Sequence, residues 1–401
     1  MDQFDIIIAG GGLSGLSLAC HLARSPFAGR SILIVDASFK ERADRTWAFW
    51  SNRPGAFDAA VSGSWNKMHF AGRDFQGVID LGDYRYQVVQ GIDFFKRVRA
   101  ELAACPNIHF RHGRVEEIHD GPEVAQVIVD GLPISGRWVF DGRGQPKRPE
   151  ASVGQTHSLN MHFFGWEIVT AEPVFDPGVA TLMDFRVPQD GATRFFYLLP
   201  YSERKALVEF TIFSAAALPR SDYENGLHNY LTKTLGSGHY EIERRESGCL
   251  PLTDRPYPRR LGRRVMAIGL RGGRLKPSSG YAFTRIQRDS AAIAHSLSTR
   301  GHPFNVPIDP QRYRLSDSLL LEIMGEHGDE IESIFCALFK NNPGERIIRF
   351  LDQDAGLWEQ LRIIPTLPPR LFIATLLRRA FRPVNNRPGK EPDHRNIAEE
   401  F

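Results

Sequence analysis

The sequence predicts an α/β fold in which a parallel-sheet domain is interleaved with an antiparallel-sheet domain and followed by a helical C-terminal region. Three observations predict this arrangement. Residues 4–9 and 32–35 are β-branched apolar runs, typical of strands buried on both faces of a parallel sheet. Residues 155–253 consist of aromatic and β-branched segments broken by Gly, Pro and Asp, as in antiparallel sheets. From about residue 310 onward the pattern is helical, with segments near 313–326, 329–340 and 343–362. An amphipathic helix is also predicted earlier in the chain, at 92–104.

Glycines follow the first apolar run at the spacing G-x-G-x-x-G, at Gly10, Gly12 and Gly15. The first glycine allows a tight turn, the second lets the backbone approach a pyrophosphate, and the third lets helix and strand pack closely. The helix that follows can bind phosphates through its free N–H groups and its dipole. Asp36 ends the second strand and is placed to accept hydrogen bonds from an adenosine ribose. This order predicts a Rossmann-like dinucleotide site, although glycine turns also join strands to helices for structural reasons alone.

Later segments favour FAD over NAD as the dinucleotide, because flavoproteins of this class return to the cofactor late in the chain. Asp141 and Gly142 follow a strand at a point where backbone can approach a cofactor, although a surface turn would look similar. A Pro-x-x-Gly segment ending at Gly280 precedes a helix predicted from about 283 to 297. In FAD enzymes of the aromatic-hydroxylase type, such a helix directs its N-terminus at the isoalloxazine.

Arg45 precedes an aromatic run, residues 46–50, that has two interpretations. In one, the segment is a loop anchored by its aromatic side chains. In the other, Arg45 reaches a flavin phosphate or ribityl oxygen, while Trp47, Phe49 and Trp50 wall the space in front of the flavin ring.

These segments divide the chain into discontinuous domains. We expect an FAD-binding domain of the aromatic-hydroxylase and glutathione-reductase type, a β-sheet substrate domain, a helical C-terminal region and a polar tail that is disordered. The predicted ranges are, in that order, 1–69 with 91–150 and 256–300, 70–90 with 151–255, 301–385, and 386–401. The aromatic content of the substrate domain implies an apolar ligand, although the same side chains could simply fill the core.

Composition narrows the function classes. The formal charge of +3 on 401 residues gives no electrostatic case for nucleic acid. The four cysteines are widely spaced without a C-x-x-C pair, so we expect no metal site, no disulfide framework and a reducing compartment. The N-terminus lacks the basic and apolar regions of a signal peptide, and no apolar run approaches the ~20 residues of a spanning helix. We expect a cytoplasmic protein.

The C-terminal segment combines apolar and basic residues. Leu371, Phe372, Leu376 and Leu377 lie beside a cluster of arginines at positions 370, 378, 379 and 382. Such a segment can lie in the headgroup region of an anionic membrane, which would place the protein peripherally on the inner face of the membrane. It could equally be a packed core helix with a solvated basic end.

With these pieces placed, the chain resembles the FAD-dependent lycopene cyclase family of bacterial carotenoid biosynthesis over nearly its whole length. The glycine motif alone is unspecific, whereas the series that follows it, in this order, is specific. The matching segments are RTWAFW at 45–50, DGRG at 141–144, FGWE at 164–167, MDFR at 183–186, VEFT at 208–211, LPL at 250–252, KPSSGY at 276–281 and RIIPTLP at 362–368.

The resemblance implies that Glu209 is the catalytic acid and base that closes the linear ends of lycopene, normally into β-rings. Many family members carry a second acid next to this glutamate, where this chain has Phe210, so a mechanism that needs two adjacent acids is in doubt. The family reaction requires reduced FAD without net redox chemistry, and NAD(P)H is the expected electron source. Strand alternation places Leu207, Glu209 and Thr211 on one face, so Glu209 could point inward. Alternatively, it faces solvent or pairs with an arginine.

The chemistry is coherent, because protonating an alkene requires an acid that burial keeps protonated, and aromatic faces stabilise the resulting cation. Glu167 and Asp184 are secondary candidates for shaping the pocket or sharing the proton, and each could instead form an ordinary salt bridge. A flavin monooxygenase or reductase acting on a polyprenyl or aromatic substrate is the competing hypothesis. Against it, Leu270 stands after Gly269 where hydroxylases usually carry Asp. A flavin-bound lipid-binding protein is a third possibility.

Overall fold

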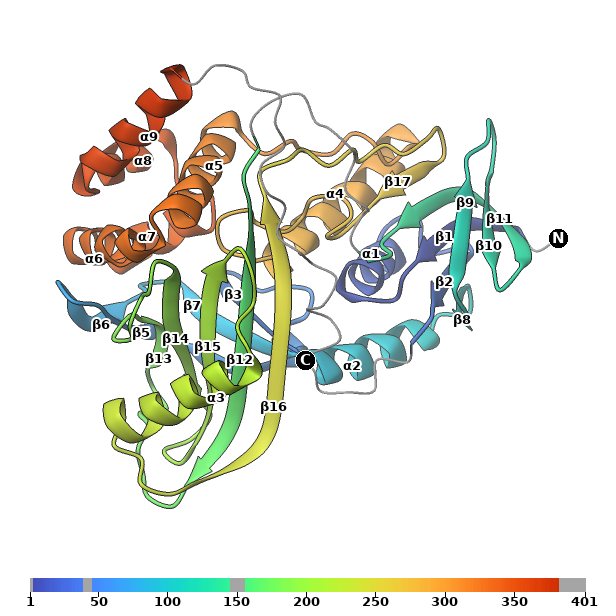
Figure 1. Ribbon diagram of the computed structural model, residues 1–401. Helices are drawn as coiled ribbons and strands as arrows, with labels where there is room; N and C mark the ends of the chain where they lie inside the picture. Colours follow the sequence, from blue (N-terminus) through green and yellow to red (C-terminus); the bar gives the residue numbers. More distant parts are fainter. Residues whose placement is uncertain (1–2, 39–44, 145–155, 382–401) are drawn as a thin grey trace.

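The computed structural model describes residues 3–38, 45–144 and 156–381, which form two lobes (Figure 1). The first lobe is built on a sheet whose parallel part has the order β8-β2-β1-β11, with β17 beside β11. An antiparallel extension, β10 and β9, continues from β11. The bounds are β1 Gln3–Ala9, β2 Ile32–Asp36, β8 Ile108–His112, β9 Val115–His119, β10 Ala125–Val129, β11 Leu132–Asp141 and β17 Val265–Ala267.

Helices α1 (Leu13–Ala23), α2 (Gly91–Ala103) and α4 (Phe283–Arg300) pack together beside this sheet. The apolar β1 strand is fully buried from Ile6 to Ala9, as its β-branched sequence predicts for a strand covered on both faces. The predicted helices at 92–104 and 283–297 are confirmed as α2 and α4, within the usual uncertainty of helix ends.

The second lobe is built on a large sheet with the order β16-β12-β15-β14-β13-β5-β6. It is antiparallel except between β13 and β5, which run parallel. One face packs against α3 (Arg220–Asn229), and the other packs against the C-terminal helices. The bounds are β5 Lys67–Ala71, β6 Gln76–Asp80, β12 Ser158–Thr170, β13 Ala180–Asp184, β14 Thr193–Pro200, β15 Lys205–Ser214 and β16 Tyr240–Thr253.

A small sheet of β3 (Thr46–Ser51), β7 (Arg85–Gln90) and β4 (Val61–Trp65) lies between the two lobes. The chain therefore enters the large sheet with β5 at Lys67, whereas the sequence placed this boundary at residue 70. It leaves that sheet after β6, and β7 pairs with β3 and β4 instead. Local alternation marks these segments as strands, but it does not specify which strands they pair with.

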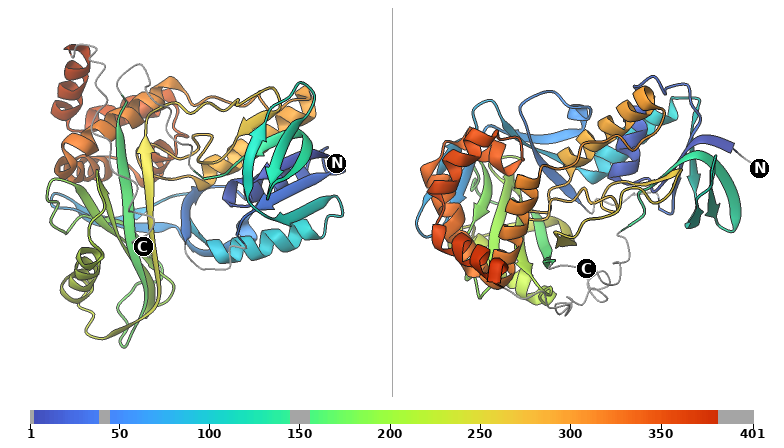
Figure 2. Two further views of the ribbon diagram at one scale, coloured as in Figure 1. Left: turned by 45° about the vertical axis from the view of Figure 1, so that its right-hand side comes forward. Right: turned by 90° about the horizontal axis from the view of Figure 1, so that it is seen from above.

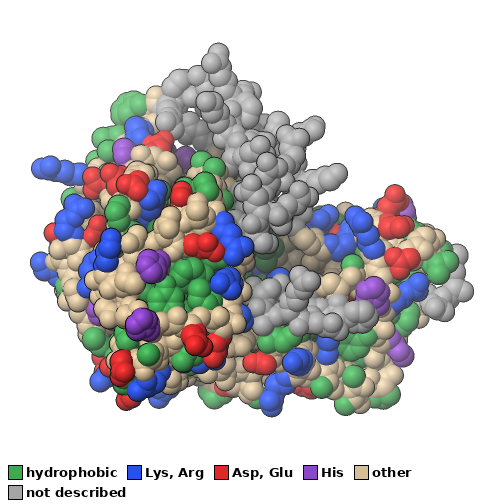
Figure 3. All heavy atoms as spheres, turned by 60° about the horizontal axis from the view of Figure 1, so that its bottom comes forward, with side chains coloured by type: hydrophobic (Ala, Val, Ile, Leu, Met, Phe, Trp, Pro, Cys, Tyr) green, Lys and Arg blue, Asp and Glu red, His purple; other side chains and the backbone are tan. Residues whose placement is uncertain are grey.

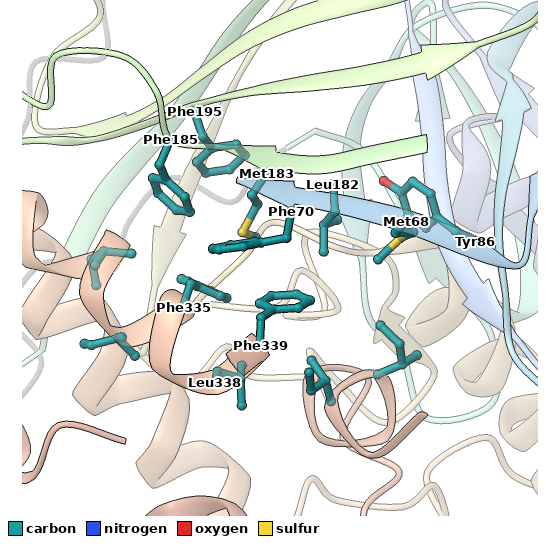
Figure 4. Close-up of a cluster of buried hydrophobic side chains, with 14 of the residues drawn as sticks. Met68, Phe70, Tyr86, Leu182, Met183, Phe185, Phe195, Phe335, Leu338 and Phe339 are labelled. Atoms are coloured by element: carbon teal, nitrogen blue, oxygen red, sulfur yellow. The ribbon is translucent and has the colours of Figure 1, made fainter. Parts of the chain in front are cut away.

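The C-terminal region is helical, as predicted, and packs on the large sheet. In Figure 4, Phe70 and Met183 of the sheet face Phe335 and Phe339 of α6, and the Phe70 and Phe339 rings stack with centroids 4.4 Å apart. The bounds are α5 Gln311–Glu326, α6 Ile331–Asn341, α7 Gly344–Leu351, α8 Leu357–Ile363 and α9 Pro369–Phe381, with short helical turns at Asp58–Ala60, Tyr230–Thr234, Gly328–Glu330 and Ile364–Thr366. The predicted tail at 386–401 lies outside the described residues.

The single helix predicted over 343–362 is wrong. It is split into α7 and α8, because Gln353 adopts a left-handed conformation with φ +61° and so ends the first helix. The second begins after Gly356, whose N–H donates to the Glu359 carboxylate at 3.0 Å.

On the face shown in Figure 3, basic and acidic side chains are interspersed over both lobes, in keeping with the near-balanced charge. The helices among the described residues include none with the length and apolar character needed to cross a membrane.

Candidate active site

Glu209 lies near the middle of β15, and the predicted alternation is observed. Its neighbours Val208 and Phe210 point to the core under α3, whereas Leu207 and Phe213 belong to the core on the opposite face. Thr211, on the same face as Glu209, donates its hydroxyl to Glu209 Oε1 at 2.9 Å. Protein encloses Glu209 closely, and its side chain keeps some accessible surface. The carboxyl therefore points inward.

A second carboxyl, Glu246 on β16, stands beside Glu209. Gly165 of β12 lies between them in register, opposite Glu209 on one side and Glu246 on the other. A Cβ placed at Gly165 would lie 3.4 Å from Cγ of both glutamates. Burial, the charge of Glu246 and a hydrogen bond with Glu246 raise the pKa of Glu209 to about 8. Glu209 is therefore mostly protonated at neutral pH.

Three tyrosines lie within electrostatic range of Glu209. The hydroxyl of Tyr281 is 3.1 Å from that of Tyr86 and 3.3 Å from that of Tyr197. Trp50 stacks on Tyr281 with ring centroids 6.2 Å apart, and its ring centroid is 4.4 Å from that of Tyr86. Burial raises the pKa values of all three phenols well above the ordinary range, so the hydroxyls stay neutral. The acid thus sits beside neutral, electron-rich rings.

Glu167, the first secondary candidate, lies two residues beyond Gly165 on β12 and is held in an ion-pair network. Lys205 Nζ is 2.8 Å from Glu167 Oε1, and Arg244 Nε donates to Oε2 at 2.9 Å. Burial opposes ionisation of Glu167, but the bonds from Lys205 and Arg244 lower its pKa overall. Glu167 therefore remains a carboxylate, and it is linked to the Glu209 region through Arg244, which also donates to Glu246 at 2.6 Å.

Asp184, the other secondary candidate, is fully buried but is not brought to Glu209. Arg186 donates to both of its oxygens, at 2.9 Å and 2.6 Å, and Tyr230 donates its hydroxyl at 2.8 Å. Tyr230 stacks on Phe196 in the core under α3, on the sheet face away from Glu209. Asp184 therefore forms an ordinary salt bridge, the second of the two roles that the sequence left open for it.

The predicted dinucleotide residues gather at the carboxyl ends of the parallel strands. Gly10 has φ +109°, and a Cβ there would lie 3.0 Å from the carbonyl oxygen of Gly142. A Cβ at Gly15 would lie 1.9 Å from Gly10 O, so only glycine permits this contact between helix and turn. At Gly12 a Cβ would meet nothing within 4 Å, and this residue starts α1 without a side-chain cap. The N-terminus of α1 thus faces open space across Gly12.

The two acids predicted for cofactor contact accept protein hydrogen bonds. Asp36 Oδ2 accepts from the N–H of Gly11 at 2.6 Å, which holds the carboxylate beside the glycine turn. Asp141 accepts from Arg143 Nε at 2.9 Å and lies 2.8 Å from Arg271 Nε. Asp141 therefore organises two arginines at this edge of the sheet.

Gly280 and Arg45 lie at the rim of this region. Gly280 has φ +73°, and a Cβ there would lie 2.8 Å from Met161 Sδ, so the turn before α4 touches the large sheet. Arg45 is exposed just before β3, where its carbonyl accepts the N–H of Gly91 at 2.9 Å. Of the aromatic run after it, Trp47 and Phe49 pack on Phe283 of α4, so they fill the core.

The family model described as "Lycopene cyclase protein" matches residues 5–377. The chain belongs to the lycopene cyclase family. This confirms the resemblance drawn from the sequence motifs. The chain is 25% identical over 309 residues to a lycopene beta-cyclase of Pseudescherichia vulneris, covering 73% of this chain and 74% of that protein. It is 29% identical over 261 residues to a lycopene beta-cyclase of Paracoccus sp., covering 60% of this chain and 63% of the relative's length.

Solved structures show that this lycopene cyclase family member has a flavoprotein fold. The crystal structure of Klebsiella pneumoniae R204Q HpxO complexed with FAD aligns with a TM-score of 0.60 at 16% identity, over 91% of this chain and all of that one. The predicted fold class, a flavoprotein of the aromatic-hydroxylase type, is thus confirmed.

Sequence reasoning missed Glu246 and the tyrosine group. Glu246 stands in the segment YEIERRESGCLPLT, where several charged residues alternate and nothing local distinguishes the one that turns inward. The tyrosines come from β7, β14 and the turn before α4, which are far apart in the sequence. Only the packing of the lobes brings them together.

Proposed function

We propose that this protein closes the linear ends of lycopene into β-ionone rings by acid-initiated cyclisation. The observation that carries the proposal is Glu209, a carboxyl whose pKa is raised by burial and by the neighbouring Glu246 and which lies beside Tyr197 in the sheet register. Protonating an isolated alkene requires such an acid, because an acid exposed to water would already be ionised at neutral pH.

The proposed reaction is an isomerisation in which protons and electrons balance. Glu209 donates its proton to the terminal alkene, whose π electrons form the new C–H bond and leave a tertiary cation. The next double bond attacks this cation and closes the ring. A ring carbon then loses a proton, which restores a double bond and leaves the substrate mass unchanged. The faces of Trp50, Tyr86 and Tyr281 can stabilise each cation by ~1–2 kcal/mol per ring.

The described residues fit FAD, which we propose as the cofactor. The N-terminus of α1 has no side-chain cap, so its N–H groups can bind a pyrophosphate, for which Gly12 leaves room, and Asp36 beside the glycine turn can accept hydrogen bonds from the ribose hydroxyls. Reduced FAD, when bound, would supply negative charge that stabilises the cation without being consumed. We propose NAD(P)H as the source of its electrons.

We also propose that the protein works on a membrane surface, at the inner face, where a long polyene would be dissolved. Helices α8 and α9 lie close together at the end of the helical region (Figures 1 and 2) and expose large apolar side chains. Trp358 of α8 is 77% exposed and Phe381 of α9 is 81% exposed, and the same two helices also expose Arg362 and Arg370. Aromatic and basic side chains together suit the headgroup region of an anionic bilayer.

Two arginines of α9 bind glutamates of α5 and so fix the orientation of α9. Arg379 donates to Glu322 of α5 at 2.5 Å, and Arg378 pairs with Glu326. Two arginines of the predicted basic cluster are thus bound to α5, while the side chains of Ile373 and Leu377 remain more than half exposed. This arrangement supports the membrane interpretation more than that of a buried core helix.

Product analysis tests the proposed function. Purified protein with FAD, a reductant and lycopene in anionic vesicles should give pigment of unchanged mass with cyclised ends. A monooxygenase or reductase would instead change the product mass and consume NAD(P)H stoichiometrically. A lipid-binding protein would return lycopene unaltered.

A further inference from the structure

The side chains of Glu246 and Glu209 lie on either side of Gly165, which has no side chain of its own. The two glutamates come from strands that do not pair with each other, and β12 between them carries Gly165 at the matching register. Because Gly165 has no side chain, nothing of β12 separates the two Cγ atoms on that face. Any larger residue at position 165 would stand between the carboxyls.

The surroundings of the two carboxyls differ. Glu246 Oε2 accepts from Arg244 Nη1 at 2.6 Å and from Thr46 Oγ1 at 2.8 Å, so a cation and a hydroxyl both bind this carboxyl. Glu209 accepts the Thr211 hydroxyl, and the structure shows no ion pair between it and a described cation. Two nearby carboxyls in unequal surroundings divide the roles, so that one keeps its charge and the other keeps its proton.

We propose that Glu246 is the second carboxyl of the acid pair: it holds the proton on Glu209 before reaction and makes the pair a stronger base after donation. The chemical part of this inference rests on the proposed function. It assigns a proton-sharing role to Glu246 on β16, one strand beyond β12 on the same sheet face as Glu209, whereas Phe210 points to the opposite face.

The proton balance follows from electrostatics. Before the reaction the pair carries one proton and one negative charge. After Glu209 donates, two carboxylates face each other in a buried site, where like charges strongly repel. The pair therefore takes a proton back readily, and the proton released by the closing ring restores the starting state. No electrons are gained or lost.

Arg244 acts as a positioning residue in this scheme. It bridges Glu246 and Glu167, and Lys205 extends the network from Glu167 to the exposed Glu243 at 2.6 Å. Glu167 therefore supports the acid pair by binding Arg244, which in turn binds Glu246. Glu246→Gln would leave Arg244 paired with Glu167, so the substitution should not leave a lone buried charge.

The test is a substrate-free titration of the FAD-loaded protein by infrared spectroscopy. The protonated-carboxyl band that Glu209→Gln abolishes belongs to Glu209. Glu246→Gln removes the neighbouring negative charge, so this band should disappear at a pH lower by about one unit or more. Glu241→Gln, an exposed glutamate near the start of the same strand, is the matched control, and the Glu209 band should titrate in it as in the natural protein.

The pH profile of cyclisation gives a second readout. In Glu246→Gln the decline of the rate at high pH should move to lower pH by the same amount, whereas the profile of Glu241→Gln should be unchanged. Identical band titration and pH profile in Glu246→Gln and the control would overturn the inference. A shifted band in a protein that cyclises nothing would leave the pair standing and overturn the proposed function instead.

Discussion

At the scale of single residues, one glutamate combines two opposed requirements. The carboxyl of Glu209 must be removed from water to stay protonated, yet an internal space must give it access to a substrate. Its place on β15 suits both requirements, because its strand neighbours are buried while its own side chain keeps some accessible surface. Such a group lowers stability, since a buried acid resists the ionisation that it undergoes freely in the unfolded chain.

The first prediction is that Glu209→Gln stabilises the protein near neutral pH. The pKa of Glu209 rises from 4.5 to about 8 on folding, so between these values the native state binds more protons and stability falls as pH rises. Gln removes this penalty, which is at most ~3 kcal/mol at pH 7 and vanishes below the unfolded pKa. Thermal unfolding at pH 7 and pH 4 measures the difference.

The matched control for this prediction is Glu203→Gln, an exposed glutamate in the turn before the same strand. It should leave the unfolding temperature unchanged at both values of pH. Destabilisation by Glu209→Gln at pH 7 would show that the carboxylate form is the native one.

At the scale of elements, local sequence predicted the β1, α1 and β2 unit well, because glycine spacing, buried strands and helix period all agree there. It placed Glu209 on the correct face of β15 for the same reason. It did not predict the pairing of β5 with β13, or of β7 with β3, because the partners of a strand are set by packing between distant segments. The position of Glu246 beside Glu209 was not predicted for the same reason, because it depends on the pairing of β16 with β12.

The turn before α1 gives the second prediction, in which Gly12→Ala weakens FAD binding without damaging the fold. A Cβ at this position meets no protein atom within 4 Å, yet it enters the space assigned to the pyrophosphate. FAD affinity should fall by about tenfold or more. Flavin fluorescence titration measures the affinity, and the melting temperature of the apoprotein should stay unchanged.

Gly29→Ala is the control for that substitution, since a Cβ there also meets nothing within 4 Å but lies in the loop after α1. It should bind FAD normally. Equal FAD affinity in both variants would remove α1 from the cofactor site.

Helices α8 and α9 give the third prediction. Replacing Trp358 and Phe381 by Ser should reduce binding to anionic vesicles by about a hundredfold or more, because each aromatic side chain that enters the interface contributes ~1.5 kcal/mol or more. Vesicle co-sedimentation measures the binding. Leu132→Ser is the control, because this side chain is also exposed, at 59%, but lies on the far lobe. If all these proteins bind vesicles equally, the membrane face lies elsewhere.

At the scale of the whole molecule, the site exists only where the lobes meet. Glu209 and Glu246 come from the large sheet, Thr46 and Tyr86 from the small sheet, and Tyr281 from the turn that leads into α4. A cofactor held at α1 and a substrate held against β15 would thus be brought together by packing between the lobes. Family membership and fold could be predicted from motifs along the chain, but this convergence could not.

The most direct measurement is cyclisation of lycopene in D₂O by the FAD-loaded, reduced protein. Each ring formed should contain one deuterium on a non-exchanging ring carbon, because Glu209 exchanges with solvent before it donates. Glu209→Gln should bind FAD and remain folded but form no rings. Rings without deuterium, or full cyclisation by Glu209→Gln, would contradict the account.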